Sequence, residues 1–139
     1  MKIAGYLSFN GNCREAMMFY QQCLGGELVF QTIGDAPLSA KMPEKMRNCI
    51  LHATLKKGRM ELLATDIVGV KGYSTGTAIS LMLQCKTKAQ IERIFNLLSE
   101  GGFQFNKLEK TFFGATIGDL KDKFGIQWTL YLPQKKTSQ

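Results

Sequence analysis

The sequence predicts an α+β fold made of two βαβββ modules, and two observations lead to this prediction. Each half has a helical pattern of apolar residues that ends at a glycine pair, Gly25-Gly26 in the first half and Gly101-Gly102 in the second. Each half also ends in a hairpin pattern, centred on Lys57-Gly58 and on Gly125. The same order of elements in both halves is typical of a duplicated unit.

The first half opens with an alternating strand over residues 3–9. A helix is predicted over residues 13–24, with Asn12 as its N-cap and Glu15 at capping-box spacing. A second strand follows over residues 27–33. Residues 34–48 are polar and contain two prolines, so we expect a loop that could act as a lid over a ligand.

A hairpin is predicted over residues 49–66, with its turn at Lys57-Gly58. This turn pairs Lys56 with Arg59 and therefore Thr54 with Glu61. One face is then apolar and is expected to pack under a helix: Cys49, Leu51, Ala53, Leu55, Met60, Leu62 and Ala64. The other face is mixed and suits a ligand cleft or a groove open to solvent: Ile50, His52, Thr54, Glu61, Leu63 and Thr65.

The second half repeats this order after a linker over residues 67–76. The predicted elements are a strand at 77–85, a helix at 88–100, and strands at 103–106, 111–118 and 126–132. We expect one domain over residues 1–139, with module one at about 1–68, module two at about 77–133 and a basic tail at 134–139. Joined edge to edge, the modules would form a curved mixed sheet around a cleft, with the helices outside.

Composition excludes several classes of protein. The chain has 139 residues, 45% hydrophobic and 21% charged, and no apolar run of the ~20 residues that span a bilayer. Its net charge of +7 comes from scattered lysines, without the clustered basic patch of nucleic-acid-binding proteins. The start lacks a signal-peptide pattern, so a cytoplasmic protein is expected. The four cysteines have no metal-finger spacing and are expected to be reduced, with Cys13 in a first helical turn, where a thiol pKa can drop.

Three segments resemble one protein family. Residues 6–26 resemble the opening strand and helix of the PhnB-like branch of the vicinal-oxygen-chelate (glyoxalase/bleomycin resistance/dioxygenase) superfamily, and residues 50–66 resemble its middle hairpin. Residues 113–128 resemble its closing hairpin, although Lys123 stands in place of the usual proline. Some members are labelled 3-demethylubiquinone methyltransferases. No glycine-rich nucleotide loop follows the first strand here, so the residues give that label no support.

The resemblance implies the positions of a metal site, but only one of these positions holds a residue that can bind a metal. Metal-dependent members hold a divalent ion with one side chain from each of strands one, four, five and eight. The matching positions are about Gly5 (or Tyr6), Glu61, Ser80 and Thr129. Only Glu61 is a competent ligand, and one carboxylate does not hold a catalytic metal. We therefore expect no metal site and no cofactor.

Residues on the predicted mixed faces form the candidate ligand pocket: His52, Thr54, Glu61, Leu63, Ser80, Met82 and Thr129. His52 and Glu61 are predicted to be diagonal neighbours and are the candidate catalytic acid–base pair. The alternative is that His52 is a hydrogen-bonded strand residue and Glu61 a salt-bridge partner. Trp128 is predicted to face the helix, while Phe112 and Phe113 are predicted to straddle the sheet.

Three functions stay open at this point. The first is a small-molecule-binding protein without the usual metal site. The second is a metal-dependent lyase, isomerase or dioxygenase of the superfamily, and the third is a non-catalytic interaction module. The resemblance also implies a bacterial protein that forms a two-fold homodimer, whose interface would cover exposed sheet edges.

Overall fold

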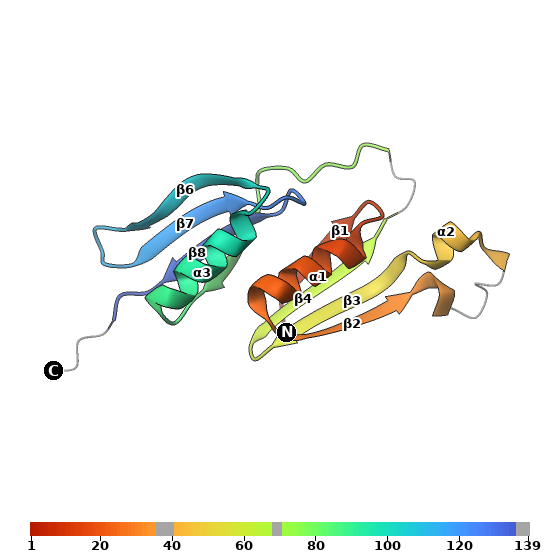
Figure 1. Ribbon diagram of the computed structural model, residues 1–139, viewed down its shortest axis with the longest axis horizontal. Helices are drawn as coiled ribbons and strands as arrows, with labels where there is room; N and C mark the ends of the chain where they lie inside the picture. Colours follow the sequence, from red (N-terminus) through yellow and green to blue (C-terminus); the bar gives the residue numbers. More distant parts are fainter. Residues whose placement is uncertain (36–40, 68–70, 136–139) are drawn as a thin grey trace. The chain divides into compact units, whose positions relative to one another are not determined.

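A computed structural model describes residues 1–35, 41–67 and 71–135 of the chain (Figure 1). The chain divides into two compact units, Met1–Tyr73 and Ser74–Gln139. Each unit contains one four-stranded mixed sheet and one helix of 12 residues. The predicted α+β fold of two βαβββ modules is therefore confirmed. Among the described residues, no helix has the length and apolarity to cross a bilayer.

In the first unit the sheet has the strand order β1-β4-β3-β2. β1 runs parallel to β4, and the other neighbours are antiparallel. Helix α1 packs across one face of this sheet (Figure 1). The elements are β1 (Gly5–Phe9), α1 (Cys13–Leu24), β2 (Glu27–Thr32), η1 (Ile33–Asp35), α2 (Glu44–Arg47), β3 (Ile50–Lys57) and β4 (Met60–Asp66).

The core of the first unit lies between α1 and the sheet. Apolar residues at helical spacing on α1 meet the alternate residues of the strands, as the period of each element requires. The fully buried side chains include Phe9, Met17, Tyr20, Ile50, Ala53, Leu55 and Ala64. Because α1 covers this face, no helix among the described residues of the first unit packs on the opposite face of the sheet.

The start of α1 differs from the prediction. The Asn12 side chain makes no capping hydrogen bond. Instead, Oδ1 of Asp66, at the end of β4, accepts a 2.9 Å bond from the backbone N–H of Cys13. Oδ2 of Asp66 accepts a second 2.9 Å bond from the N–H of Ile50. One carboxylate thus joins the start of α1, the start of β3 and the end of β4, and it satisfies a backbone donor that the first helical turn leaves open.

The turn of the β3–β4 hairpin lies one residue later than predicted. Lys57 pairs with Met60, so Gly58 and Arg59 form the turn and the predicted Lys56–Arg59 pair is wrong. Gly58 has a φ of +57°. That angle suits glycine at the first position of a two-residue hairpin turn. The register moves by two residues, which preserves the two faces of the hairpin.

A bulge at the start of β3 changes two assignments. Thr32 pairs with Ile50, whereas the preceding Gln31 pairs with His52, so Leu51 is an extra residue between them. Ile50 is therefore 0% exposed and Leu51 is 45% exposed. The prediction had placed Ile50 on the mixed face and Leu51 in the core, and both placements are wrong.

The second unit has the strand order β5-β8-β7-β6, the same pattern as the first. Helix α3 is capped by Thr87, whose side chain accepts a bond from the N–H of Gln90. The elements are β5 (Leu81–Gln84), α3 (Lys88–Ser99), β6 (Phe103–Lys110), β7 (Thr116–Lys121) and β8 (Gln127–Leu132).

The β6–β7 connection corrects another prediction. β6 extends to Lys110, and β7 begins only at Thr116. Phe112 and Phe113 lie in the turn between these strands and do not straddle the sheet. Phe112 is 102% exposed, and its ring meets that of Phe113 edge to face with centroids 5.2 Å apart.

The glycine pairs that end the two helices have matching surroundings. A Cβ on Gly26 would lie 2.6 Å from the carbonyl oxygen of Lys56, near the end of β3. A Cβ on Gly102 would collide with the carbonyl oxygen of Lys121, at the end of β7. In each unit the second glycine therefore lets the chain leaving the helix pass close to the third strand. This shared packing accounts for the repeat seen in the sequence.

Two predicted loops fall partly outside the described residues. Of the loop at 34–48, residues 36–40 lie outside, and the described remainder contains the end of η1 and all of α2. Of the linker at 67–76, residues 68–70 lie outside, as do residues 136–139 of the basic tail. Tyr73 in the linker is anchored, because its hydroxyl donates a 2.9 Å bond to the carbonyl of Ser8.

Candidate functional site

The helix-free face of the first sheet, called the open face below, carries the candidate site. Strand pairing places Tyr6 beside Leu63, Leu63 beside Thr54, and Thr54 beside Val29. These four side chains form a row across all four strands, and His52 lies one step along β3 from Thr54 on the same face. Three of the seven residues predicted for the pocket are therefore close neighbours here: His52, Thr54 and Leu63.

His52, Thr54 and Tyr6 form the chemical centre of the open face. Nε2 of His52 lies 3.3 Å from Oγ1 of Thr54, and the His52 ring lies 6.5 Å from the ring of Tyr6, tilted by 32°. The imidazole and the hydroxyl can each donate or accept a hydrogen bond. Polar groups beside an exposed aromatic ring can orient a ligand that has both a planar part and a polar part.

A hollow of about 340 Å³ adjoins this centre at the β2–β3 edge. It is lined by Glu27, Val29, Thr54 and Lys56. Its volume is near the lower end of the ~300–1,000 Å³ range of ligand pockets. Thr54 belongs both to the hollow and to the contact with His52, so a ligand in the hollow could reach the imidazole.

Glu61 is held by lysines and is not beside His52. Its Oε2 lies 2.6 Å from Nζ of Lys2 and 4.0 Å from Nζ of Lys56. The hydrogen bond from Lys2 lowers the pKa of Glu61, and the charges of Lys2 and Lys56 act in the same direction. Glu61 pairs with Lys56 across the hairpin. The predicted adjacency of His52 and Glu61 is therefore wrong, and with it the geometric basis for an acid–base pair.

The residues at the metal positions of the related enzymes do not fit a metal ion. Gly5 pairs with Leu62 on the face covered by α1, so the first-strand residue on the side of Glu61 is Tyr6. Glu61, the one carboxylate of the set, is bound to Lys2. Within residues 1–35, 41–67 and 71–135, no three His, Cys, Asp or Glu side chains come together to hold a metal ion.

The remaining predicted pocket residues belong to the second unit. Met82 pairs with Thr129 on the face of the second sheet opposite α3, while Ser80 is exposed just before β5. Thr129 donates a 2.6 Å bond to Oδ1 of Asp119, whose Oδ2 accepts a 2.9 Å bond from Asn106. Sequence reasoning missed Asp119. Its alternation with the buried Gly118 and Leu120 was the signal that could have placed it on this face.

Burial makes the thiols of Cys13 and Cys85 poor nucleophiles. Burial, together with the nearby Asp66 carboxylate, raises the pKa of Cys13 to about 12. A first helical turn can lower a thiol pKa, but at Cys13 burial has the opposite effect, in line with the expected reduced thiol. Burial also raises the pKa of Cys85. Cys49 is the least buried of the four cysteines, all of which are free thiols.

Solved structures place this fold in a known class. A glyoxalase/bleomycin resistance protein/dioxygenase family enzyme from Burkholderia phytofirmans matches with a TM-score of 0.62 and 14% identity, over 92% of this chain and 96% of that one. At this identity the likeness shows the fold alone. The predicted glyoxalase-like fold is confirmed.

The family follows from closer matches. The family model described as 3-demethylubiquinone-9 3-methyltransferase matches residues 1–131, and the chain belongs to this PhnB-like family. Protein PA1353 from Pseudomonas aeruginosa has 38% identity and a TM-score of 0.84, over 97% of this chain and 99% of that one. The PhnB protein from Bacillus cereus has 27% identity and a TM-score of 0.78, over 95% and 99%. Protein YjdN from Escherichia coli (strain K12) is 27% identical over the full length of both chains.

Proposed function

We propose that this protein binds a small molecule on the open face of its first sheet. The observation that carries the proposal is the group of Tyr6, His52 and Thr54 beside the 340 Å³ hollow. The imidazole and the hydroxyl lie in contact there, beside the exposed ring of Tyr6. The hollow has the volume for a ligand. Tyr6, His52 and Thr54 can orient that ligand through hydrogen bonds and contact with the tyrosine ring.

Charge at the hollow indicates the kind of ligand. Lys56 lines it with a largely exposed ammonium group, and Glu27 stands at the same end. The chain as a whole carries a net charge of +7, which favours the approach of anions. We therefore expect a ligand with a planar or apolar part near Tyr6 and an anionic or hydrogen-bonding part near Lys56 and Thr54.

The proposal contains no metal-assisted step. The residues at the metal positions give one carboxylate, and that carboxylate already pairs with lysine. It contains no methyl transfer either, because the first strand is followed by Asn10-Gly11-Asn12 and not by a glycine-rich nucleotide loop. Element analysis of protein purified without chelator tests the first point, and a stoichiometric transition metal would contradict it.

A thermal-shift screen tests the proposal directly. The library contains small carboxylates, phosphates and aromatic amphiphiles, and compounds that raise the melting temperature are retested on His52→Ala and Thr54→Val. Thr116→Val, a strand threonine of the second sheet, is the matched control. We expect both site variants to reduce the shift and the control to retain it. Equal shifts in all proteins would place the ligand elsewhere.

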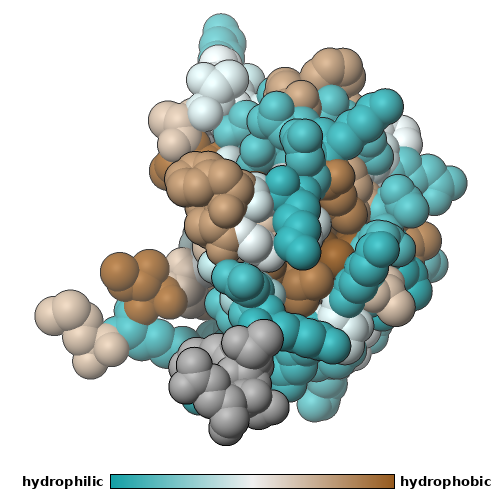
Figure 2. Space-filling view, turned by 90° about the vertical axis from the view of Figure 1, so that its left-hand side faces the viewer, coloured by the Kyte–Doolittle hydropathy of each residue, from teal (hydrophilic) through white to brown (hydrophobic). Residues whose placement is uncertain are grey.

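The proposal includes a two-fold homodimer. Each sheet has edge strands whose backbone groups are open to pairing, and large apolar side chains are exposed near those of the second unit: Ile79, Met82, Phe103 and Phe105. Figure 2 shows hydrophobic residues exposed among hydrophilic ones on the surface that it presents. Light scattering coupled to size exclusion should give twice the 15.5 kDa chain mass, and the chain mass itself would contradict a dimer.

A further inference from the structure

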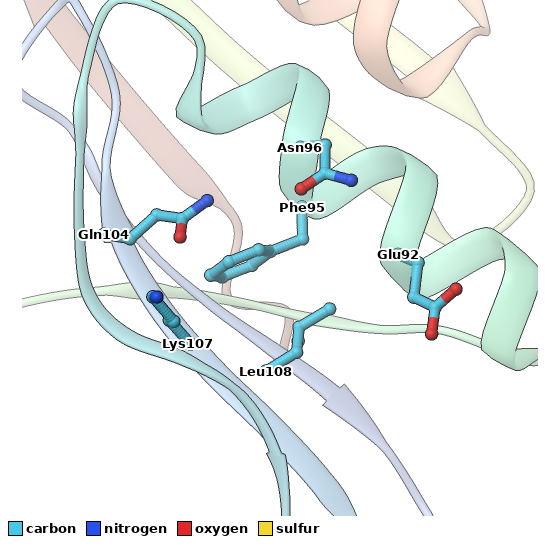
Figure 3. A pocket seen from close by; sticks show the side chains of 6 residues that line it. All are labelled: Glu92, Phe95, Asn96, Gln104, Lys107 and Leu108. Carbon is cyan, nitrogen blue, oxygen red and sulfur yellow. The ribbon is translucent and has the colours of Figure 1, made fainter.

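A second hollow lies on the second unit, between helix α3 and the edge strand β6. Its volume is about 260 Å³, and Figure 3 shows the side chains that line it: Glu92, Phe95, Asn96, Gln104, Lys107 and Leu108. Phe95 and Leu108 form the apolar floor (Figure 3). This hollow shares no residue with the open face of the first sheet.

Gly118 explains why the side chains of Phe95 and Leu108 lie close to the backbone of β7. A Cβ on Gly118 of β7 would lie 2.8 Å from Cε2 of Phe95 and 2.8 Å from Cδ2 of Leu108. Because Gly118 has no side chain, the side chains of Phe95 and Leu108 can pack directly against the backbone of β7. The pairing of β6 with β7 is also irregular between Gln104 and Glu109. Such bulges bend an edge strand, and here they leave the space between β6 and α3 unfilled.

The rim of this hollow has two amides and two opposite charges. Asn96 and Glu92 come from α3, and Gln104 and Lys107 come from β6 (Figure 3). Within the described part of the chain, the side chains of Asn96, Gln104 and Lys107 have no hydrogen-bond or ion-pair partner. Glu92 has only a loose 3.9 Å contact with the exposed Lys88. These groups are therefore available to a ligand at little cost.

We propose that this hollow binds a dipeptide or a zwitterion of the same form. A carboxamide both donates and accepts hydrogen bonds, so Asn96 and Gln104 match the N–H and C=O of a peptide bond. Glu92 pairs with the ligand ammonium, and Lys107, on the opposite wall, pairs with its carboxylate. Phe95 and Leu108 contact an apolar side chain. One acidic and one basic rim residue, Glu92 and Lys107, match the two opposite charges of a zwitterion.

Glycyl-leucine is the probe for the test, titrated into the full ¹⁵N-labelled chain. We expect the largest amide shift changes at residues 92–96 and 104–108. Lys107→Gln should weaken binding about tenfold, because it removes the partner of the carboxylate. Lys110→Gln removes the same charge from the end of β6 outside the hollow, and it should leave the affinity within about twofold. Shift changes confined to other residues, or equal loss in both variants, would overturn the proposal.

The ligand itself provides a second test. N-acetyl-glycyl-leucine amide keeps the peptide bond and the side chain but lacks both charges, so it should bind about tenfold more weakly or worse. Equal affinity would contradict the pairing with Glu92 and Lys107. His52→Ala should leave glycyl-leucine binding unchanged, because His52 is not among the residues that line this hollow. The proposal for this hollow and the proposal for the open face of the first sheet can therefore be disproved independently of each other.

Discussion

The indole N–H of Trp128 donates a 2.8 Å hydrogen bond to Oδ2 of Asp122, which is only 3% exposed. Oδ1 of the same carboxylate accepts bonds from the backbone N–H groups of Phe124 and Ile126. One buried carboxylate thus organises the turn between β7 and β8 and fixes the indole under α3. The segment that carried much of the family resemblance, Asp122 to Trp128, is therefore a structural motif, and the prediction that Trp128 packs in the core is confirmed.

Removing this carboxylate should strongly destabilise the protein. Asp122→Ala removes the buried acceptor of two backbone N–H groups and of the indole N–H, so we expect a loss of about 3 kcal/mol in the free energy of unfolding. Asp119→Ala is the control, since Asp119 is partly exposed and water can replace it; its cost should be about 1 kcal/mol. Urea unfolding of both variants measures the difference, and similar losses would contradict the structural role of Asp122.

Alanine at the second glycine after α1 should also be costly. Gly26 has a φ of +104°, and its Cβ would meet the Lys56 carbonyl at 2.6 Å. We expect Gly26→Ala to cost about 3 kcal/mol, from backbone strain and this collision together. Gly11 has a φ of +90° but nothing within 4 Å, so Gly11→Ala isolates the strain and should cost about 1 kcal/mol. Equal melting temperatures for Gly26→Ala and Gly11→Ala would contradict an additional cost from the collision with the Lys56 carbonyl.

Thiol labelling should distinguish the four cysteines. Cys13, Cys23 and Cys85 are buried, and the pKa of Cys13 is about 12, so its thiolate is absent at ordinary pH. We expect Ellman's reagent at pH 8 to label only Cys49 rapidly in the native protein and all four thiols in denaturant. Cys49→Ser should abolish the rapid phase. A rapid phase that persists in this variant would contradict the burial of the other three.

The lysine contact of Glu61 gives a pH prediction. The pKa of Glu61 is lowered in the folded state. The charged carboxylate therefore stabilises the fold at pH values above the unfolded pKa, near 4.5, and this stabilisation is lost as the pH falls through the folded pKa. An NMR titration of the Glu61 carboxyl should show the lowered pKa. Lys2→Ala should raise it toward the ordinary value, as should high salt. Lys86→Ala is the control, since Lys86 is not among the lysines that act on Glu61, and it should leave this pKa unchanged. An unchanged pKa in Lys2→Ala would contradict the ion pair.

Much of the fold could be predicted because its signals are local. Helix periodicity and the glycine pairs gave α1 and α3 within a residue of their ends. The mixed face of the middle hairpin was also predictable, since alternation survives a shift of two residues. His52, Thr54 and Leu63 therefore occupy the expected face despite the wrong turn.

The predictions that were wrong depend on interactions between residues that are distant in the sequence. The bulge that exchanges Ile50 and Leu51 depends on pairing with β2 and on Asp66, and two adjacent aliphatic residues give no sign of it. Asp66 replaces Asn12 at the start of α1 from a position 53 residues from Cys13. The contact of Lys2 with Glu61 likewise spans 59 residues, so alternation alone could not show that Glu61 is already paired.

Chemical-shift mapping tests the central claim most directly. The compound that most stabilises the protein in the thermal screen is titrated into the ¹⁵N-labelled chain, and amide shift changes are assigned to residues. Binding at the open face of the first sheet predicts the largest changes at His52, Thr54 and Leu63. A map confined to residues outside the first sheet would contradict the claim.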